Sequence, residues 1–176
     1  VRAREIKPFG DLVLADVDAY GAKTANLAEL RRMLPDQLTP DGFGVPFFFY
    51  HSFMLENGFY AEADEMISDE DFQRDPAIRE ERLKAFRKTI KNGIAPQWML
   101  DELQELHDSF PDGTSLRCRS STNNEDLPDF NGAGLYESFT HHPHEGHLIK
   151  SMKQVWAGLW TYRAFEEREF YRINHF

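Results

Sequence analysis

The stretch from Ser115 to Ser138 brings together side chains that suit an anion such as a nucleotide phosphate. It contains Arg117 and Arg119, the hydroxyl pair Ser120-Ser121 and the glycine-containing run 132–134. Arginine offers a planar fork of N–H donors that matches phosphate oxygens, and glycines let backbone N–H groups come close to a ligand. These residue types indicate a phosphate site. Surface arginines and an incidental G-x-G remain the alternative, because neither feature is specific by itself.

The same stretch begins with the alternation of a strand. Leu116 and Cys118 alternate with Arg117 and Arg119, which predicts two apolar side chains on the core face and two arginines on the other face. We interpret the single cysteine as a small buried strand residue, and it excludes an internal disulfide. A lone cysteine also fits a reducing compartment, so we expect a cytoplasmic protein.

A second basic site is predicted at the start of a helix that Gly21 precedes and Pro35 follows. Lys23 lies in the first turn of this helix. The first turn carries partial positive charge and N–H groups that can bind an anion. An ordinary surface lysine is the alternative. The predicted apolar face of the helix consists of Leu27, Leu30 and Leu34.

Three ordered motifs carry a resemblance to a known family. They are Arg119-Ser120-Ser121, then Glu125-Asp126-Leu127-Pro128, then Gly134 with Glu137-Ser138. The order resembles the nucleotide-binding domain of phosphoenolpyruvate synthase and pyruvate phosphate dikinase, whose usual form is V-R-S-S-A-x-x-E-D-L-P followed by S-F-A-G-Q-x-E-T. The version G-A-G-L-Y-E-S found here is closer to the branch that includes the glucan water dikinases. Residues 21–30 and 42–53 also match the family, with a weaker match at 155–163.

The resemblance implies a fold and a domain organisation. We expect an α+β fold, the N-terminal lobe of an ATP-grasp-like nucleotide-binding domain, with a small mixed sheet packed by helices. Residues 1–176 would form a single domain, one part of the ATP-binding domain of a larger multidomain protein. The implied partners are ATP and the remaining domains of the same polypeptide, namely a second ATP lobe and a phosphohistidine domain.

The resemblance also implies roles for individual residues. ATP would be bound by Lys23, Arg119, Gly132, Gly134 and Ser138, the last of which stands where the family has Thr. The Mg²⁺ ligands are expected in the second lobe, so we assign neither a metal ligand nor a catalytic residue to this chain. In the full protein, a water-dikinase type of phosphotransferase, phosphoryl transfer from ATP would pass through a histidine of another domain to pyruvate or another acceptor such as a glucan. This chain alone is predicted to be inactive.

Two departures from the family pattern favour a different reading. Ala22 replaces the second glycine of the family's G-G-K, and Leu135-Tyr136 replace its glutamine. They suit a non-catalytic acidic interaction or regulatory module that keeps the fold without binding nucleotide. Retained Lys23 and Arg119 favour nucleotide binding. Arg117 is not part of the family motif, and its role is open.

Charge and hydropathy exclude some functional classes and leave others open. The chain has 20 Lys and Arg against 30 Asp and Glu, and this net charge of −10 argues against non-specific nucleic-acid binding. No stretch approaches the ~20 apolar residues of a membrane span.

Four histidines within 141–147 raise a zinc hypothesis, which the loop-forming Pro143 and Gly146 disfavour. The acidic residues of 59–78 are interpreted as a solvated insertion or the tip of a helix hairpin, not as a Ca²⁺ or Mg²⁺ site.

Periodicity predicts the remaining elements. We expect a strand at 12–15, a strand at 43–47 that leads into a helix at 50–56, helices at 78–91 and 96–110, and a final helix from 148 to the end. The phenylalanines of 43–53 are interpreted as core, with an adenine pocket as the alternative. The tail 163–172 is expected to be mostly exposed. The predicted buried face of the last helix is Ile149, Met152, Trp156, Leu159 and Trp160.

Overall fold

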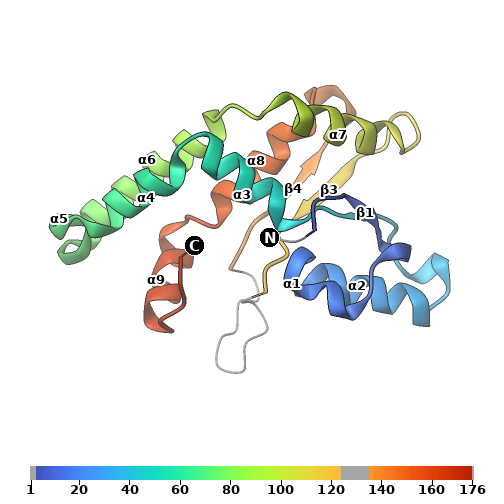
Figure 1. Ribbon diagram of the computed structural model, residues 1–176, viewed down its shortest axis with the longest axis horizontal. Helices are drawn as coiled ribbons and strands as arrows, with labels where there is room; N and C mark the ends of the chain where they lie inside the picture. Colours follow the sequence, from blue (N-terminus) through green and yellow to red (C-terminus); the bar gives the residue numbers. More distant parts are fainter. Residues whose placement is uncertain (1–2, 124–134, 176) are drawn as a thin grey trace. The chain divides into compact units, whose positions relative to one another are not determined.

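The computed structural model describes residues 3–123 and 135–175. The chain divides into two compact units. The first unit comprises residues 1–51 and 120–133, and the second comprises 52–119 and 134–176. Helices predominate, and the described strands form two short antiparallel pairs, so the α+β prediction is confirmed (Figure 1).

In the first unit a short strand pair and two helices surround a small core. Strand β1 (Lys7–Pro8) pairs antiparallel with β2 (Phe43–Gly44), and α1 (Val17–Tyr20) is followed by α2 (Ala22–Met33). The predicted strand at 12–15 is wrong, because the chain there enters a 3₁₀ turn in which Asp16 Oδ2 accepts a hydrogen bond from the Val13 amide at 2.9 Å. The core cluster consists of Phe9, Leu12, Tyr20 and Ala28.

Helix α2 buries a different face from the one predicted. Leu30 and Leu34 are 45% and 41% exposed, and Leu27 is half-buried. The buried positions carry small side chains, because the core of this unit lies very close to the helix. A Cβ on Gly44 would come within 2.8 Å of side-chain atoms of Leu12 and Thr24. The buried residues of α2 are Ala22, Thr24, Ala25 and Ala28.

Helix α3 (Phe47–Glu56) begins earlier than predicted and replaces the end of the expected strand. The amide of Phe49 donates to the carbonyl of Pro46 at 3.0 Å, which forms the first turn. Phe49 and Phe53 are fully buried. The interpretation of these phenylalanines as core is therefore confirmed for these two residues.

The second unit contains a helix hairpin where the acidic sequence lies. Helices α4 (Phe59–Ser68) and α6 (Pro76–Asn92) lie side by side, and α5 (Glu70–Arg74) forms the tip (Figure 1). Asp69 accepts hydrogen bonds from two amides at the start of α5, and Asp75 does the same for α6. Aspartate is a favoured N-cap, so these acids serve the helix ends. The alternative of a helix hairpin tip is thus confirmed.

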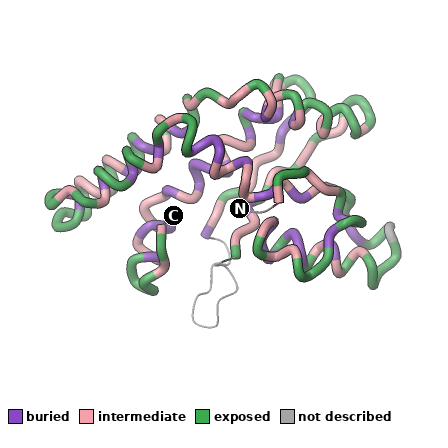
Figure 2. The backbone as a smooth tube through the Cα atoms, in the orientation of Figure 1, coloured by how far each residue is buried: buried purple, intermediate pink, exposed green. Residues whose placement is uncertain are grey.

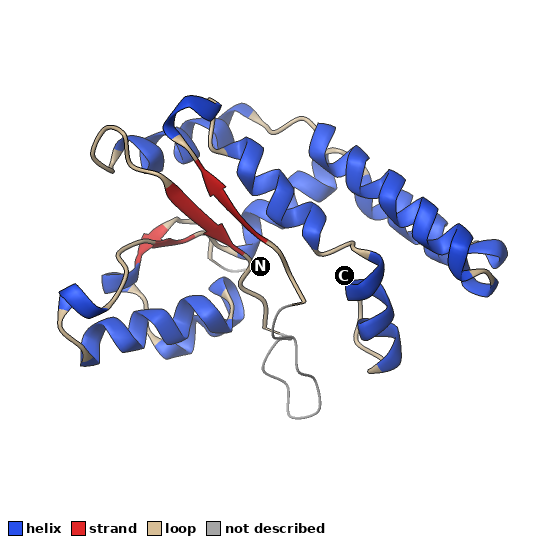
Figure 3. Ribbon diagram, turned by 180° about the vertical axis from the view of Figure 1, so that it is seen from behind, coloured by secondary structure: helices blue, strands red, loops and turns tan. Residues whose placement is uncertain are grey.

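The remaining elements of the second unit are a helix, a strand pair and two C-terminal helices. Helix α7 (Gln97–Asp108) precedes β3 (Leu116–Arg119), which pairs antiparallel with β4 (Ser138–His141). Helix α8 (Ile149–Gly158) packs against this pair (Figure 3). The predicted single C-terminal helix is two helices, because Thr161 caps α9 (Tyr162–Phe170) by accepting a hydrogen bond from the Ala164 amide.

Aromatic side chains fill the core of the second unit. Buried residues recur along its helices between exposed and half-buried ones (Figure 2). The Phe53 and Trp156 rings lie 4.9 Å apart, as do those of Phe86 and Trp160. Ile149, Trp156 and Trp160 are buried as predicted, whereas Met152 and Leu159 are half-buried.

The strands differ in one respect from the expected small mixed sheet. In residues 3–123 and 135–175 they form two separate antiparallel sheets, β1-β2 and β3-β4. The pairs are two and four residues long. None of the helices in the described residues is long and apolar enough to cross a membrane.

Candidate functional site

The start of α2 is held by the segment that follows Arg119 in the chain. The amide of Thr24 donates to Ser121 Oγ at 3.0 Å, and the amide of Ala22 donates to the carbonyl of Thr122 at 3.0 Å. The first amides of a helix have no partner within the helix. Ser121 and Thr122 supply those partners from 97 and 100 positions further along the chain. These two amides therefore serve the fold and are not available to an anion, contrary to the expectation from the position of Lys23 in the first turn.

Gly21 makes this close approach geometrically feasible. Its φ is +83°, and a Cβ at this position would lie 2.5 Å from the backbone carbon of Ser121. A residue with a side chain would therefore be strained and would also collide with Ser121. Lys23 is exposed, so its side chain points outward from the turn that Gly21 and Ser121 stabilise.

The β3–β4 pair places two of the predicted phosphate-binding residues opposite each other. The register pairs Arg119 with Ser138 and Arg117 with Thr140. Directly opposed residues of an antiparallel pair project from the same face. Arg117 and Arg119 are exposed, as the alternation predicted. We call the four side chains of Arg117, Arg119, Ser138 and Thr140 the hairpin face.

The opposite side of the pair faces the protein. There His141 is completely buried and Cys118 is half-buried. Burial raises the pKa of the Cys118 thiol to about 11, and the nearby Arg117 lowers it by a smaller amount. A thiol with so high a pKa carries almost no thiolate at neutral pH and is a poor nucleophile. The interpretation of Cys118 as a packing residue fits this environment.

The residues just before β4 are tied to helices of the same unit. Leu135 is buried, and the Tyr136 hydroxyl lies 3.5 Å from Arg168 Nη1. Glu137 Oε2 lies 3.4 Å from Arg87 Nη2. The positions where this chain departs from the family's glutamine therefore serve packing and anchoring.

Arg168 lies in the tail that is predicted to be mostly exposed, but its side chain is buried. It is only 4% exposed and donates to the carbonyl of Leu159 at 2.7 Å and to His175 Nδ1 at 3.0 Å. In the sequence Arg168 is one of several charged residues in a row, so its type does not reveal that it is buried. Only the packing of α9 shows this.

Other proposed binding residues fall outside the described parts of the chain. They are Gly132, Gly134 and the motif from Glu125 to Pro128. The described Phe48 is half-buried, with the Arg4 guanidinium 4.9 Å from its ring centroid. Phe49 and Phe53 are fully buried, so neither presents a ring to an adenine base.

The histidine-rich segment is divided between core and surface. His141 Nε2 lies 3.0 Å from the Gly146 carbonyl, and Nδ1 lies 3.0 Å from Ser151 Oγ. Because a carbonyl oxygen can only accept, Nε2–H donates to it, and Nδ1 of the neutral ring accepts a hydrogen bond from the Ser151 hydroxyl. Burial lowers the pKa of His141. In the described ranges no group of three or more His, Cys, Asp or Glu side chains is arranged to hold a metal ion.

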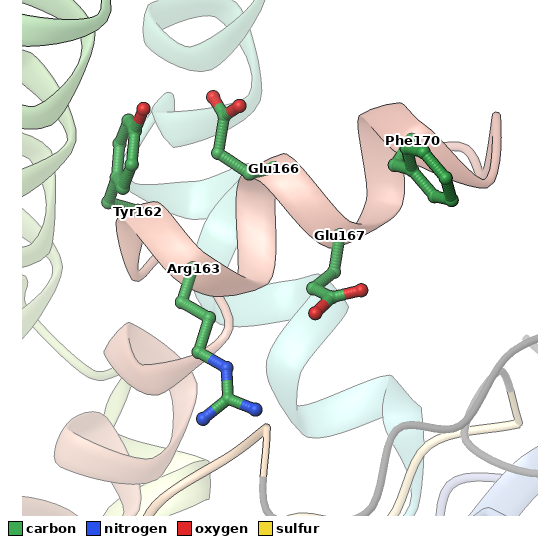
Figure 4. A pocket seen from close by; sticks show the side chains of 5 residues that line it. All are labelled: Tyr162, Arg163, Glu166, Glu167 and Phe170. Atoms are coloured by element: carbon green, nitrogen blue, oxygen red, sulfur yellow. The ribbon is translucent and has the colours of Figure 1, made fainter.

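A hollow on the surface of α9 is lined by Tyr162, Arg163, Glu166, Glu167 and Phe170 (Figure 4). All five come from one helix, and Arg163 and Glu166 point away from each other. None of the predicted phosphate-binding residues lines it. This hollow does not have the converging polar groups of a ligand site.

Comparison with known proteins gives a family match over most of the chain. The model for the family described as pyruvate phosphate dikinase, AMP/ATP-binding domain, matches residues 17–176. The phosphoenolpyruvate synthase of Deinococcus radiodurans is 27% identical over 172 residues, which cover 97% of this chain and 21% of that protein. The probable phosphoenolpyruvate synthase of Archaeoglobus fulgidus is 29% identical, with 93% and 22% covered. The Helicobacter pylori phosphoenolpyruvate synthase is 26% identical, with 98% and 22% covered. The chain thus spans about a fifth of the length of these curated relatives.

Proposed function

This chain belongs to the pyruvate phosphate dikinase AMP/ATP-binding domain family, and we propose that it forms the N-terminal, ATP-binding lobe of a phosphoenolpyruvate synthase-like dikinase. The resemblance seen in the sequence motifs is confirmed by the family match. ATP binding by this chain is supported by the description of the family. The α+β architecture suits a nucleotide-binding lobe of this kind.

One observation carries the proposal furthest, namely the contact between the R-S-S segment and the start of α2. Ser121 follows Arg119 by two residues and holds the amide of Thr24, which directly follows Lys23 in the chain. The two motifs that supply the proposed basic residues are therefore joined by a hydrogen bond between residues next to them. This contact lies within the first unit, and a structural link between the two motifs suits motifs that serve the same ligand.

We infer that Lys23 and Arg119 neutralise the phosphate charge of ATP and that Ser138 donates its hydroxyl to a phosphate oxygen. Gly132 and Gly134 would offer backbone N–H groups. Arginine suits this role because its fork forms two parallel hydrogen bonds to phosphate. The chain's net charge of −10 repels ATP at long range, so such local cations are needed.

Magnesium is expected to arrive as Mg-ATP, with its protein ligands in the second ATP lobe. The described residues offer no cluster of acids or histidines that fits a metal ion. The ion would neutralise phosphate charge during transfer. What this chain's own residues contribute is to hold and orient the phosphate chain.

The full protein would transfer a phosphoryl group through a histidine of another domain to pyruvate or a different acceptor. We propose this activity because relatives of the chain are named phosphoenolpyruvate synthases. We propose a cytoplasmic location, which the single cysteine supports. The rest of the polypeptide is the proposed partner, and residues 1–176 are proposed to act as one part of the ATP-binding domain.

Calorimetric titration with Mg-ATP at low salt tests the proposal. The unmodified chain should bind, and Arg119→Ala and Lys23→Ala should each weaken binding about tenfold or more, because each removes a charge-assisted contact. The absence of Mg-ATP binding by all three proteins would instead favour a non-catalytic module. AMP formation from ATP by residues 1–176 alone would contradict the expectation that this part is inactive.

A further inference from the structure

The hairpin face carries more positive charge than the proposed function uses. Arg119 is assigned to the nucleotide phosphates, whereas Arg117 belongs to no family motif. The register places both arginines on one exposed face, each opposite a hydroxyl residue. Side chains two apart on a strand project from the same face and start about 7 Å apart.

Carboxylates in the described residues do not balance these two charges. Glu137 directly precedes β4, so its place in the alternation differs from that of Ser138 and Thr140. Its carboxylate pairs with Arg87 of α6. Among the described residues, neither Arg117 nor Arg119 forms an ion pair. Two like charges side by side are unfavourable, and a bound anion relieves that repulsion.

The Arg117 side chain is also held in place. Its Nη1 donates to Thr140 Oγ1 at 2.8 Å, across the strand pair. One hydroxyl contact on one nitrogen leaves the other donors of the guanidinium for a second acceptor. A side chain that is already ordered loses less entropy when it binds a ligand.

We propose that Arg117 is a second phosphate-binding residue, so that the hairpin face binds a chain of two or more linked phosphate groups. The proposal rests on the assignment of Arg119 to the phosphates of ATP. Each arginine fork is matched to the oxygens of one phosphate group, and two forks about 7 Å apart at their backbones suit two groups better than one. Thr140 is then a positioning residue, since it contacts Arg117 and orients its fork.

The test compares inorganic tripolyphosphate, inorganic orthophosphate and Mg-ATP as probes of the 176-residue chain. Arg117→Ala should weaken tripolyphosphate binding about tenfold or more. Arg117→Lys keeps the positive charge and loses the fork of donors. Its affinity for tripolyphosphate should therefore lie between that of the unmodified chain and that of Arg117→Ala. Thr140→Val should weaken binding about two- to threefold, because Arg117 is no longer held. Orthophosphate binding should change less in Arg117→Ala than tripolyphosphate binding does.

Arg74→Ala is the matched control, since Arg74 is an exposed arginine of the same unit, 77% exposed, at the tip of the helix hairpin. It removes the same charge and should change binding less than twofold. Thermal melts of all variants check that they fold.

The outcomes separate this inference from the proposed function. If Arg119→Ala weakens Mg-ATP binding while Arg117→Ala matches Arg74→Ala with every probe, the inference is overturned and the proposed function stands. If neither Arg119→Ala nor Arg117→Ala changes binding, both are overturned. An unmodified chain that binds Mg-ATP but not tripolyphosphate overturns the inference and leaves the proposed function standing.

Discussion

The start of α2 and the β3–β4 pair each carry a basic residue proposed to bind phosphate, but they present it in different ways. At α2, backbone amides near Lys23 already bond to Ser121 and Thr122, so the local polar groups maintain the fold. At the strand pair, the backbone is used in the ladder, and Arg117 and Arg119 project into solvent. Changes to Gly21 and Ser121, which hold the start of α2, should therefore act mainly on stability, and changes on the hairpin face mainly on binding.

The largest effect is expected from Gly21→Ala. The new Cβ would lie 2.5 Å from Ser121 backbone atoms on a residue with φ +83°, so the variant should lose about 3 kcal/mol or more of unfolding free energy. Urea denaturation measures it. Gly58→Ala is the control, since Gly58 has φ +71° but open space around its Cβ, and it should cost about 1 kcal/mol. Equal losses would show that the approach of Ser121 is not what requires glycine.

Ser121→Ala should have the next largest effect, because it removes the acceptor of the Thr24 amide. Loss of a helix cap costs about 1 kcal/mol, and the Thr24 amide should exchange faster with solvent. Ser115→Ala provides a comparison at an exposed serine that bonds to His142 at 3.2 Å, and it should cost less than about 0.5 kcal/mol. Unchanged exchange at Thr24 would argue against the cap.

Acid should weaken the second unit through its buried histidines. Burial lowers the pKa of His141 and His175 in the folded state. The unfolded chain therefore binds more protons once the pH falls below about 6.5, and the unfolding free energy decreases from there towards the lower folded pKa values. Well above pH 6.5 these histidines are neutral in both the folded and the unfolded state, so they contribute no pH dependence to stability there.

Urea midpoints at pH 7.5, 6.5 and 5.5 measure this loss. His141→Gln should reduce the slope of the unfolding free energy against pH. His144→Gln, at an exposed position, should leave that slope unchanged. Amide exchange should show protection falling first in the second unit. A stability that rises as the pH falls from 7.5 to 5.5 would contradict the assignment.

The smallest effect is expected at the tip of the helix hairpin. Arg74 and Glu70 form an ion pair at 3.1 Å with both side chains 77% exposed. Glu70→Gln should change the unfolding free energy by less than about 0.5 kcal/mol and leave Mg-ATP affinity unaltered. A clear gain in affinity would mean that overall charge, and not the hairpin face, controls phosphate binding.

Local patterns predicted the second unit better than the first. Gly93 ends α6, Pro96 precedes α7, and Leu116 to Arg119 alternate as expected, because each depends on neighbours in the chain. In α2 the leucine spacing was misleading. The helix packs through alanines and Thr24, because close approach of the core left no room for larger side chains on that face.

The sequence by itself determined the family, the α+β class, the strand that carries Arg119 and the alternation of its arginines, since motifs and short-range periodicity are properties of the chain. Only the tertiary structure decided which face of α2 is buried, that Ser121 caps that helix and that Arg117 is held by Thr140. These contacts join residues 23 to 97 positions apart. Such partners are selected by packing and strand register, which no local pattern encodes.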